Sequence, residues 1–299
     1  MTDIEQRLER AQQQHIELTQ RAVVAATTIA RAHGLQVDDP GVLAQGCAVR
    51  IHLSPAPVVA RVSTLTALMR APIDSWLARE VEVAAFLASR GAPVVPPSDV
   101  LPPGPHHHEG LSVTFWRYVP ATSAALPDAP LAGRMLADLH TALRDYPGPL
   151  PLLAPPLNDI PRALERLEQA GNILPADSLL LLRKSYERLL PRLSESALGP
   201  LQPLHGDAHV YNLIPVADGW LWNDFEDTCR GPIGWDLASM DSDGQALAAY
   251  PGAPGRESLE LFRKVRRLHA ITWGYALIEQ FPDWGPHVAS MLEALRQKE

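Results

Sequence analysis

The chain has 299 residues, a hydrophobic fraction of 46% and a formal net charge of −8, so it can bury a large core in one domain or two lobes, and its acidic balance argues against nucleic acid as a partner. Its two cysteines, Cys47 and Cys229, exclude a disulfide framework and a zinc ribbon. The charged N-terminus lacks the apolar stretch of a signal peptide, and no apolar run approaches the roughly 18 residues of a membrane span, so we expect a cytoplasmic protein without a membrane partner.

The first part of the chain predicts a helix followed by three strands. Residues 4–31 are rich in Glu, Gln, Arg and Ala, which favours a helix that packs on the first lobe. Residues 42–53 are typical of two strands with a bend at Gly46, and residues 58–62 are typical of a third strand.

A second helix is predicted over residues 76–90, with Asp74 and Ser75 as candidate caps and Gly91 at its end. One face of this helix is apolar apart from a single carboxylate, and it contains Leu77, Glu80, Ala84 and Leu87. A buried carboxylate is unfavourable unless it is paired, so Glu80 requires a cation.

Arg61, in the middle of the third predicted strand, is the natural partner of Glu80. Two alternatives remain open. Strand alternation also allows Arg61 to point to solvent. Glu82 replaces Glu80 if the helix is shifted in register, although Glu82 lies on a more polar face.

The middle and the end of the chain are predicted to be mainly helical. His106, His107 and His108 follow a proline-rich segment and are expected at an exposed hairpin tip, and residues 111–120 are predicted as a strand that ends at a proline. Helices are then predicted over residues 131–143, 160–170, 176–193, 257–280 and 286–298.

The most specific pattern in the chain begins at His205-Gly206-Asp207. Asn212 follows Asp207 with four residues between them, and Asp224 opens an Asp-Phe-Glu tripeptide twelve residues after Asn212. Phosphoryl transfer from a nucleotide uses a carboxylate, an amide and a second carboxylate in this order, as in the H-x-D-x-x-x-x-N and D-F-x segments of protein kinases. Asp207 is the candidate that orients the acceptor hydroxyl and accepts its proton.

A predicted hairpin brings the two candidate metal ligands together. Residues 213–216 and 219–222 are apolar and flank a turn. This hairpin returns Asp224 to the side of Asn212, so one ion could touch both. Mg²⁺ prefers oxygen ligands from proteins and nucleotide phosphates, which makes Asn212 and Asp224 its candidate ligands.

His205 and His209 allow a different interpretation, in which they bind a transition metal in a hydrolase. The usual zinc signatures contain further His or Cys at short spacing, and none occurs nearby. The complete pattern with Asn212 and Asp224 is more specific than either fragment, so phosphoryl transfer is the preferred interpretation.

These residues resemble the aminoglycoside phosphotransferase and choline kinase family, whose catalytic loop contains H-G-D. Residues 231–238 are similar to the family's G-x-x-x-x-D-L-A run, and the resemblance extends from about residue 41 to the C-terminus. It implies an α+β, two-lobed protein-kinase-like fold. A small antiparallel-sheet lobe at residues 1–120 would cover the nucleotide, and a larger, mainly helical lobe at residues 121–299 would supply the catalytic and substrate-binding groups.

The resemblance also implies roles for residues of the first lobe. Arg61 stands where the fold has a lysine that holds the nucleotide phosphates, paired with Glu80, although Arg and Lys are not interchangeable. Gly46 marks a phosphate-covering loop without G-x-G-x-x-G. Backbone groups from Arg117 to Val119 would read the adenine edge between the lobes.

Three further residues are expected to support the catalytic loop. The resemblance makes Asp236 its buttress and His205 its anchor. His140 is expected in the core or as a second buttress.

The implied reaction transfers the γ-phosphoryl group of ATP or GTP, with Mg²⁺, to a hydroxyl of a small acceptor of the aminoglycoside or amino-alcohol kind. Four acidic residues would favour a cationic acceptor if several face the cleft; they are Glu226, Asp227, Asp241 and Asp243. The alternative is a nucleotide-binding regulator with weak or no catalysis. The glycine-poor loop and Arg61 favour this alternative, whereas the presence of Asp207, Asn212 and Asp224 argues against it.

Overall fold

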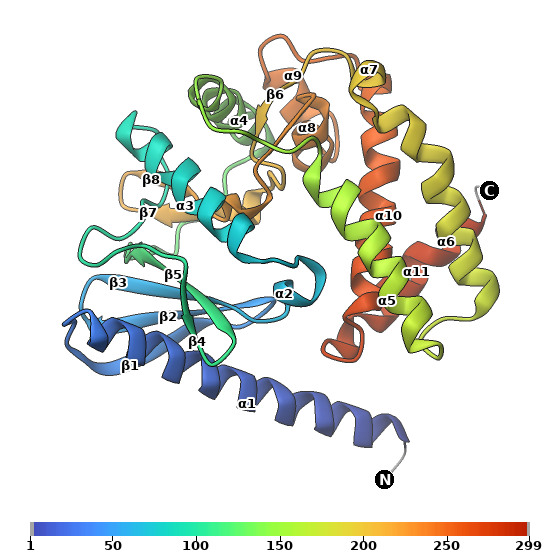
Figure 1. Cartoon of the computed structure of the whole chain (residues 1–299). Coiled ribbons are helices and arrows are strands. Elements are labelled where there is room, and N and C mark those ends of the chain that lie inside the picture. Colours follow the sequence, from blue (N-terminus) through green and yellow to red (C-terminus); the bar gives the residue numbers. More distant parts are fainter. Residues whose placement is uncertain (1–2, 298–299) are drawn as a thin grey trace.

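The computed structural model describes residues 3–297. Figure 1 shows an antiparallel sheet with a helix on each face, beside a mainly helical part that contains the C-terminus. The α+β architecture agrees with the predicted fold class. The predicted boundary between residues 120 and 121 lies in the irregular segment that joins the two parts. No helix within residues 3–297 is long and apolar enough to cross a membrane.

Five strands form the sheet of the first lobe. In order across the sheet they are β1 (Val37–Ala44), β2 (Ala48–Pro55), β3 (Val58–Ser63), β5 (Leu111–Arg117) and β4 (His106–His108).

Two strand predictions need correction, and both concern the edges of the sheet. β1 begins at Val37 rather than at residue 42, and its side chains are mostly exposed, so it lacks the apolar alternation of a half-buried strand. His106–His108 forms edge strand β4 rather than a hairpin tip. The chain turns instead at Glu109 and Gly110, which both have positive φ.

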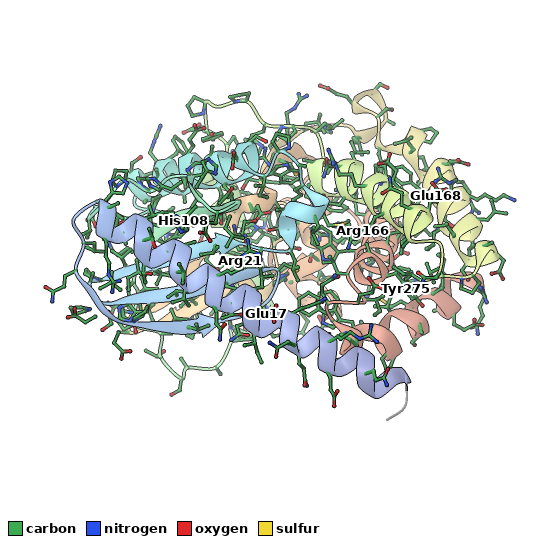
Figure 2. The ribbon with its side chains drawn as sticks, turned by 60° about the horizontal axis from the view of Figure 1, so that its bottom comes forward. Glu17, Arg21, His108, Arg166, Glu168 and Tyr275 are labelled. Carbon is green, nitrogen blue, oxygen red and sulfur yellow. The ribbon has the colours of Figure 1, made fainter. Side chains whose placement is uncertain are left out.

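Helix α1 (Asp3–Ala32) covers one face of the sheet. Ala22, Ala25, Ala26 and Ala30 are fully buried there, because small side chains let the helix approach the strands closely. Figure 2 shows this helix lying across the sheet, with Glu17 and Arg21 labelled. Its first half extends to the second lobe, where the His15 ring contacts the Phe281 ring at 5.0 Å.

The side chains of β3 alternate between the two faces of the sheet. Val58, Ala60 and Val62 pack in the core under α1. Arg61 therefore points to the opposite face, and it is only 6% exposed on a central strand. The alternative in which Arg61 points to solvent is wrong.

Helix α3 (Asp74–Ser89) lies on that opposite face. The four residues of its predicted inner face, Leu77, Glu80, Ala84 and Leu87, are all buried. The predicted caps are wrong, because the residue before the helix is Ile73, which is already in helical conformation after the short helix α2 (Thr66–Met69). Asp74 instead accepts a hydrogen bond from Ser112 Oγ at 2.8 Å.

Long helices make up most of the second lobe. They are α4 (Ala129–Leu143), α5 (Ile160–Ala170), α6 (Ala176–Leu189), α10 (Glu260–Ala276) and α11 (Gly285–Arg296). Shorter helices are α7 (Glu195–Leu198), α8 (Gly234–Met240) and α9 (Gln245–Ala249). The predicted helices 176–193 and 257–280 are too long, because 3₁₀ turns occupy Leu190–Leu193 and Arg256–Leu259.

Two short ribbons frame the catalytic segment. β6 (Gln202–Leu204) pairs with β9 (Cys229–Gly231), and β7 (Leu213–Val216) pairs with β8 (Gly219–Trp222) as the predicted hairpin. The amide of Val95 donates to the carbonyl of Trp222 at 2.8 Å. This bond ties the hairpin to the segment that leaves α3, on the same side of the sheet as that helix.

Candidate active site

Asp236, on α8, supports the turn that contains His205 and Gly206. Its fully buried carboxylate accepts hydrogen bonds from the amides of His205 (2.9 Å) and Gly206 (3.0 Å) and from Nε2 of His140 (2.9 Å). Burial by itself would raise the pKa of Asp236, but the hydrogen bond and charge of His140 lower it below its usual value. Asp236 and His140 therefore make the contacts expected of buttresses.

Gly206 occupies a position that admits no side chain. Its φ is +92°, and a Cβ atom would overlap the backbone carbonyl of Asp227. The glycine of the His-Gly-Asp motif is thus required by a left-handed backbone and a close approach.

His205 is fully buried and uses both ring nitrogens. Nδ1 accepts from the amide of Asp207 (3.3 Å), and Nε2 donates to the carbonyl of Asn223 (3.1 Å). Burial lowers the pKa of His205, so the ring is neutral. The ring anchors the loop and has no nitrogen left for a metal. No group of three or more His, Cys, Asp or Glu residues in the described chain is arranged to hold an ion, and the hydrolase interpretation lacks support.

Both carboxylate oxygens of Asp207 have basic side chains as partners. Oδ1 lies 3.3 Å from Nη1 of Arg266, and Oδ2 lies 3.3 Å from Nε2 of His209. Burial opposes charge on both partners, but their hydrogen bond lowers the pKa of Asp207 and raises that of His209. Asp207 is therefore ionised, and it lines a cleft of 540 Å³ between the lobes, here termed the main cleft.

Arg266, on α10, is a candidate site residue that sequence reasoning missed. Its Nη2 donates to the carbonyl of Gly206 (2.9 Å) and its Nε to that of Trp235 (3.0 Å), and the guanidinium stacks on the Trp235 ring at 4.0 Å. The guanidinium thus fixes the turn and the carboxylate of Asp207 together. Nothing in the helical pattern distinguishes Arg266 from its neighbours, because the contact joins residues 59 positions apart.

The hairpin places Asn212 and Asp224 at its two open ends. The amide of Asn223 donates to the carbonyl of Asn212 at 3.0 Å, directly before Asp224, which has a left-handed φ of +65°. Nδ2 of Asn212 donates to the carbonyl of Asp207 at 2.9 Å. That bond fixes which atom of the amide is free, so an oxygen remains for a ligand.

This donor set fits Mg²⁺ bound together with a nucleotide. One amide oxygen and one carboxylate are hard oxygen donors, but they are too few to hold an ion alone, and Mg²⁺ commonly completes its shell with phosphates and water. Arg61 lowers the pKa of Asp224 in spite of burial, which would raise it, so the carboxylate is charged.

Arg61 forms the ion pair with Glu80 that the sequence predicts. Nη1 of Arg61 lies 3.3 Å from Oε2 of Glu80, and Nη2 contacts Asp224 (3.4 Å) and Glu226. Burial raises the pKa of Glu80 to about 8 against the opposing effect of Arg61. Glu82 accepts a bond from Tyr146 Oη at 3.4 Å and has no part in this cluster.

Arg70, at the end of α2, extends the charge cluster into the second lobe. It contacts Glu226 (2.8 Å), Asp227 (2.5 Å) and Asp159 (2.8 Å), and Asp159 also pairs with His269 at 3.1 Å. Sequence reasoning missed Arg70, Asp159 and His269, because they carry no recognisable local motif.

The four acidic candidates for acceptor binding separate into two pairs. Glu226 and Asp227 line the main cleft, but both are paired with Arg70. Asp241 is buried and bonded to Arg263, and Asp243 bonds Gln245; neither lines the cleft. Few free carboxylates therefore face the acceptor.

Two cavities meet between the lobes. A cavity of 110 Å³ is bounded by the segment from Trp116 to Val119 and by apolar residues such as Val59 and Ile214, and it includes Arg117 and Glu80. A larger cleft of 540 Å³ contains Gly46 and Asp207. The residues that line both are Arg50, Arg61 and Asp224. All the residues predicted for the site except Asn212, which adjoins Asp207, thus border one cavity or the other.

Three residues predicted to bind the nucleotide through their backbone, Gly46, Arg117 and Val119, differ in which groups are free to bind it. Gly46 has ordinary backbone angles and open space around it, so its conformation does not require glycine. The Arg117 side chain turns outward to Asp99 at 2.6 Å, and its amide is bonded to the carbonyl of Pro96. The amide of Val119 has no backbone partner within residues 3–297, and it is the donor this segment leaves free.

Comparison with known proteins agrees with this geometry. Residues 49–253, more than half of the chain, match the phosphotransferase enzyme family. No curated protein matches the sequence significantly.

Three solved structures share the fold at low sequence identity. A choline kinase, LicA from Streptococcus pneumoniae, has a TM-score of 0.64 and 16% identity over 92% of this chain and 99% of its own. An amicoumacin kinase in complex with AMP-PNP, Ca²⁺ and its substrate has a TM-score of 0.63 and 12% identity over 91% and 93%. The GDP complex of an aminoglycoside 2′-phosphotransferase has a TM-score of 0.61 and 18% identity over 91% and 96%. The chain therefore belongs to the phosphotransferase enzyme family, as a small-molecule kinase with the two-lobed protein-kinase-like fold.

Proposed function

We propose that the chain transfers the γ-phosphoryl group of ATP or GTP to a hydroxyl of a small amino-alcohol-like acceptor. The observation that carries this proposal is the junction of the two cavities at Asp224 and Arg61, with Asp207 on the wall of the larger one. A nucleotide with its base in the smaller cavity and its phosphates at the junction would present its γ-phosphorus to a hydroxyl beside Asp207.

Each residue has a role in this reaction. Arg61, oriented by Glu80, binds phosphate oxygens, and the free backbone groups between Arg117 and Val119 bind the base. Asn212 and Asp224 would hold Mg²⁺, which when bound neutralises negative charge on the phosphates. Asp207 accepts a hydrogen bond from the acceptor hydroxyl and takes its proton as the oxygen–phosphorus bond forms. The bond between the γ-phosphorus and the β,γ-bridging oxygen breaks, and the nucleoside diphosphate leaves. Its lowered pKa suits orientation more than strong base catalysis.

The neutralised carboxylates favour an acceptor with few amines. Glu226 and Asp227 are paired with Arg70, so they offer little charge to a polyamine such as an aminoglycoside. The acceptor side of the cleft is instead bounded by Trp235, Trp273 and His269. Among related folds, one structure contains AMP-PNP and another contains GDP, so both nucleotides belong in the assay.

The test measures nucleotide binding and transfer in the wild-type protein and in Asp207→Asn. Thermal shift with ATP and with GTP, each with and without Mg²⁺, reports binding to the folded state. Transfer to a panel of amino alcohols and aminoglycosides is followed by release of the nucleoside diphosphate. We expect Asp207→Asn to keep the nucleotide shift and to lose transfer by about 10³-fold, since positioned acid–base groups contribute about 10²- to 10⁴-fold.

Two results would contradict the proposal. A wild-type protein that binds nucleotide but transfers phosphate to none of these acceptors would favour the regulator. A variant with Asp207→Asn that retains full transfer would remove Asp207 from the reaction.

A further inference from the structure

Two arginines stand side by side where the cavities meet. Arg50 on β2 and Arg61 on β3 are direct cross-strand partners. Both reach one carboxylate: Nη2 of Arg50 lies 2.8 Å from Oδ2 of Asp224, and Nη2 of Arg61 lies 3.4 Å from Oδ1. Like charges opposite each other destabilise a sheet unless an anion lies between them. Asp224 is the carboxylate that the two guanidinium groups share.

The two arginines differ in what else they contact. Arg61 is buried and also has Glu80 and Glu226 as partners. The Arg50 side chain is 36% exposed, and within residues 3–297 Asp224 is its one carboxylate partner. Arg50 can therefore exchange its partner without leaving a buried charge unpaired, whereas Arg61 is fixed.

The location of Arg50 matches the path of a polyphosphate. Arg50, Arg61 and Asp224 line both cavities, so the phosphates of a nucleotide that spans them must pass these side chains. The loop at Gln45, Gly46 and Cys47 contains a single glycine. Side-chain cations must then supply much of the charge neutralisation that a glycine-rich loop would provide through its amides.

We propose that Arg50 is a second phosphate-binding cation, which holds Asp224 in the absence of nucleotide and releases it to the metal when the phosphates arrive. The proposal rests on the proposed function. A nucleotide carries more negative charge than Asp224, and bidentate guanidinium–phosphate bonds are among the stronger hydrogen bonds. Before that exchange, a metal ion would have to compete with Arg50 and Arg61 for the carboxylate of Asp224.

The experiment is isothermal titration of the full chain with two probes, ADP in the presence of EDTA and Mg²⁺ without nucleotide. In Arg50→Gln we expect ADP to bind about 10- to 100-fold more weakly, the effect of one hydrogen bond to a charged group. Mg²⁺ alone should bind more tightly than to wild type, because Asp224 has lost a competing cation. Arg50→Lys should fall between them for ADP, because it keeps the charge and loses the fork.

Arg90→Gln is the matched control. It removes the same charge from the first lobe at an exposed position whose nearest acid, Asp145, lies 3.9 Å away, and both affinities should equal those of wild type. Unchanged ADP affinity in Arg50→Gln, with wild type binding ADP, overturns this inference and leaves the proposed function intact. Absence of binding of both ADP and GDP to wild type, in EDTA and with Mg²⁺, overturns both.

Discussion

Two buried carboxylates, one in each lobe, differ in how their charge is satisfied. Asp236 in the second lobe receives two backbone amides and His140, and its pKa is lowered. Glu80 in the first lobe is buried to the same degree, but its Oε2 faces Arg61 at 3.3 Å without hydrogen-bond geometry, and its pKa is raised to about 8.

The two carboxylates are equally buried, so the hydrogen bonds they accept decide whether the pKa is lowered or raised. A carboxylate that accepts several well-directed donors keeps its charge in a low-dielectric site, whereas a nearby cation shared with other acids compensates less. Arg61 is shared among Glu80, Asp224 and Glu226. The turn at His205 and Gly206 is thus held by well-directed hydrogen bonds, whereas the cluster around Arg61 compensates the charge of Glu80 less completely.

The largest expected effect in this comparison is that of Asp236→Asn. The change removes the charge that receives three buried donors, so we expect a loss of about 2–4 kcal/mol in the free energy of unfolding and a fall of at least about 5 °C in Tm. Chemical denaturation and calorimetry measure both. Asp138→Asn, at an exposed position of α4, is the control and should change neither. A loss equal to that of the control would show that the amides do not depend on the carboxylate.

An intermediate effect is expected for Arg266→Gln, which frees one oxygen of Asp207. We expect kcat to fall by about 10- to 100-fold, since Arg266 positions the carboxylate of Asp207. The KM for the nucleotide should change little, because Arg266 does not line the smaller cavity proposed for the base. The pKa of Asp207 should rise without this cation, so the acid limb of the pH–rate profile should move to higher pH. The neighbouring Arg267→Gln is the control. An unmoved acid limb would reduce Arg266 to a purely structural role.

The third prediction concerns how stability depends on pH, rather than its value at one pH, and it uses Glu80→Gln. Burial raises the pKa of Glu80 above its ordinary value of 4.5 toward about 8, so in this window the folded protein binds more of the Glu80 proton than the unfolded chain does. Wild-type stability should therefore fall as pH rises through this window, by up to about 1.4 kcal/mol per pH unit relative to Glu80→Gln.

Measuring stability as a function of pH also distinguishes Glu80 from Asp236. The pKa of Asp236 lies below its ordinary value of 3.8, so its contribution is constant above about pH 4 and is lost only in acid. The free energy of unfolding of Asp236→Asn, plotted against pH, should consequently run parallel to that of wild type from pH 5 to pH 8. The curve of Glu80→Gln should diverge from both. Parallel curves for all three proteins would show that Glu80 is ionised throughout.

Local sequence predicted the catalytic segment well. The hairpin from Leu213 to Trp222 forms with its two-residue turn, and Glu80 faces inward as its helical period requires. The errors lie where neighbours override local preference. Ile73 starts α3 in place of a polar cap, and β4 forms because a central strand, β5, offers it hydrogen bonds.

The sequence by itself predicted the candidate motif residues Asp207, Asn212 and Asp224, and it favoured the pairing of Arg61 with Glu80. Each depends on spacing within one element or on the requirement that a buried charge be paired. Only the tertiary structure decided that Arg50, Arg70 and Arg266 share carboxylates with that site. Exposed and buried arginines have the same appearance in a sequence, and side chains from distant segments come within hydrogen-bond distance only when the whole core has packed.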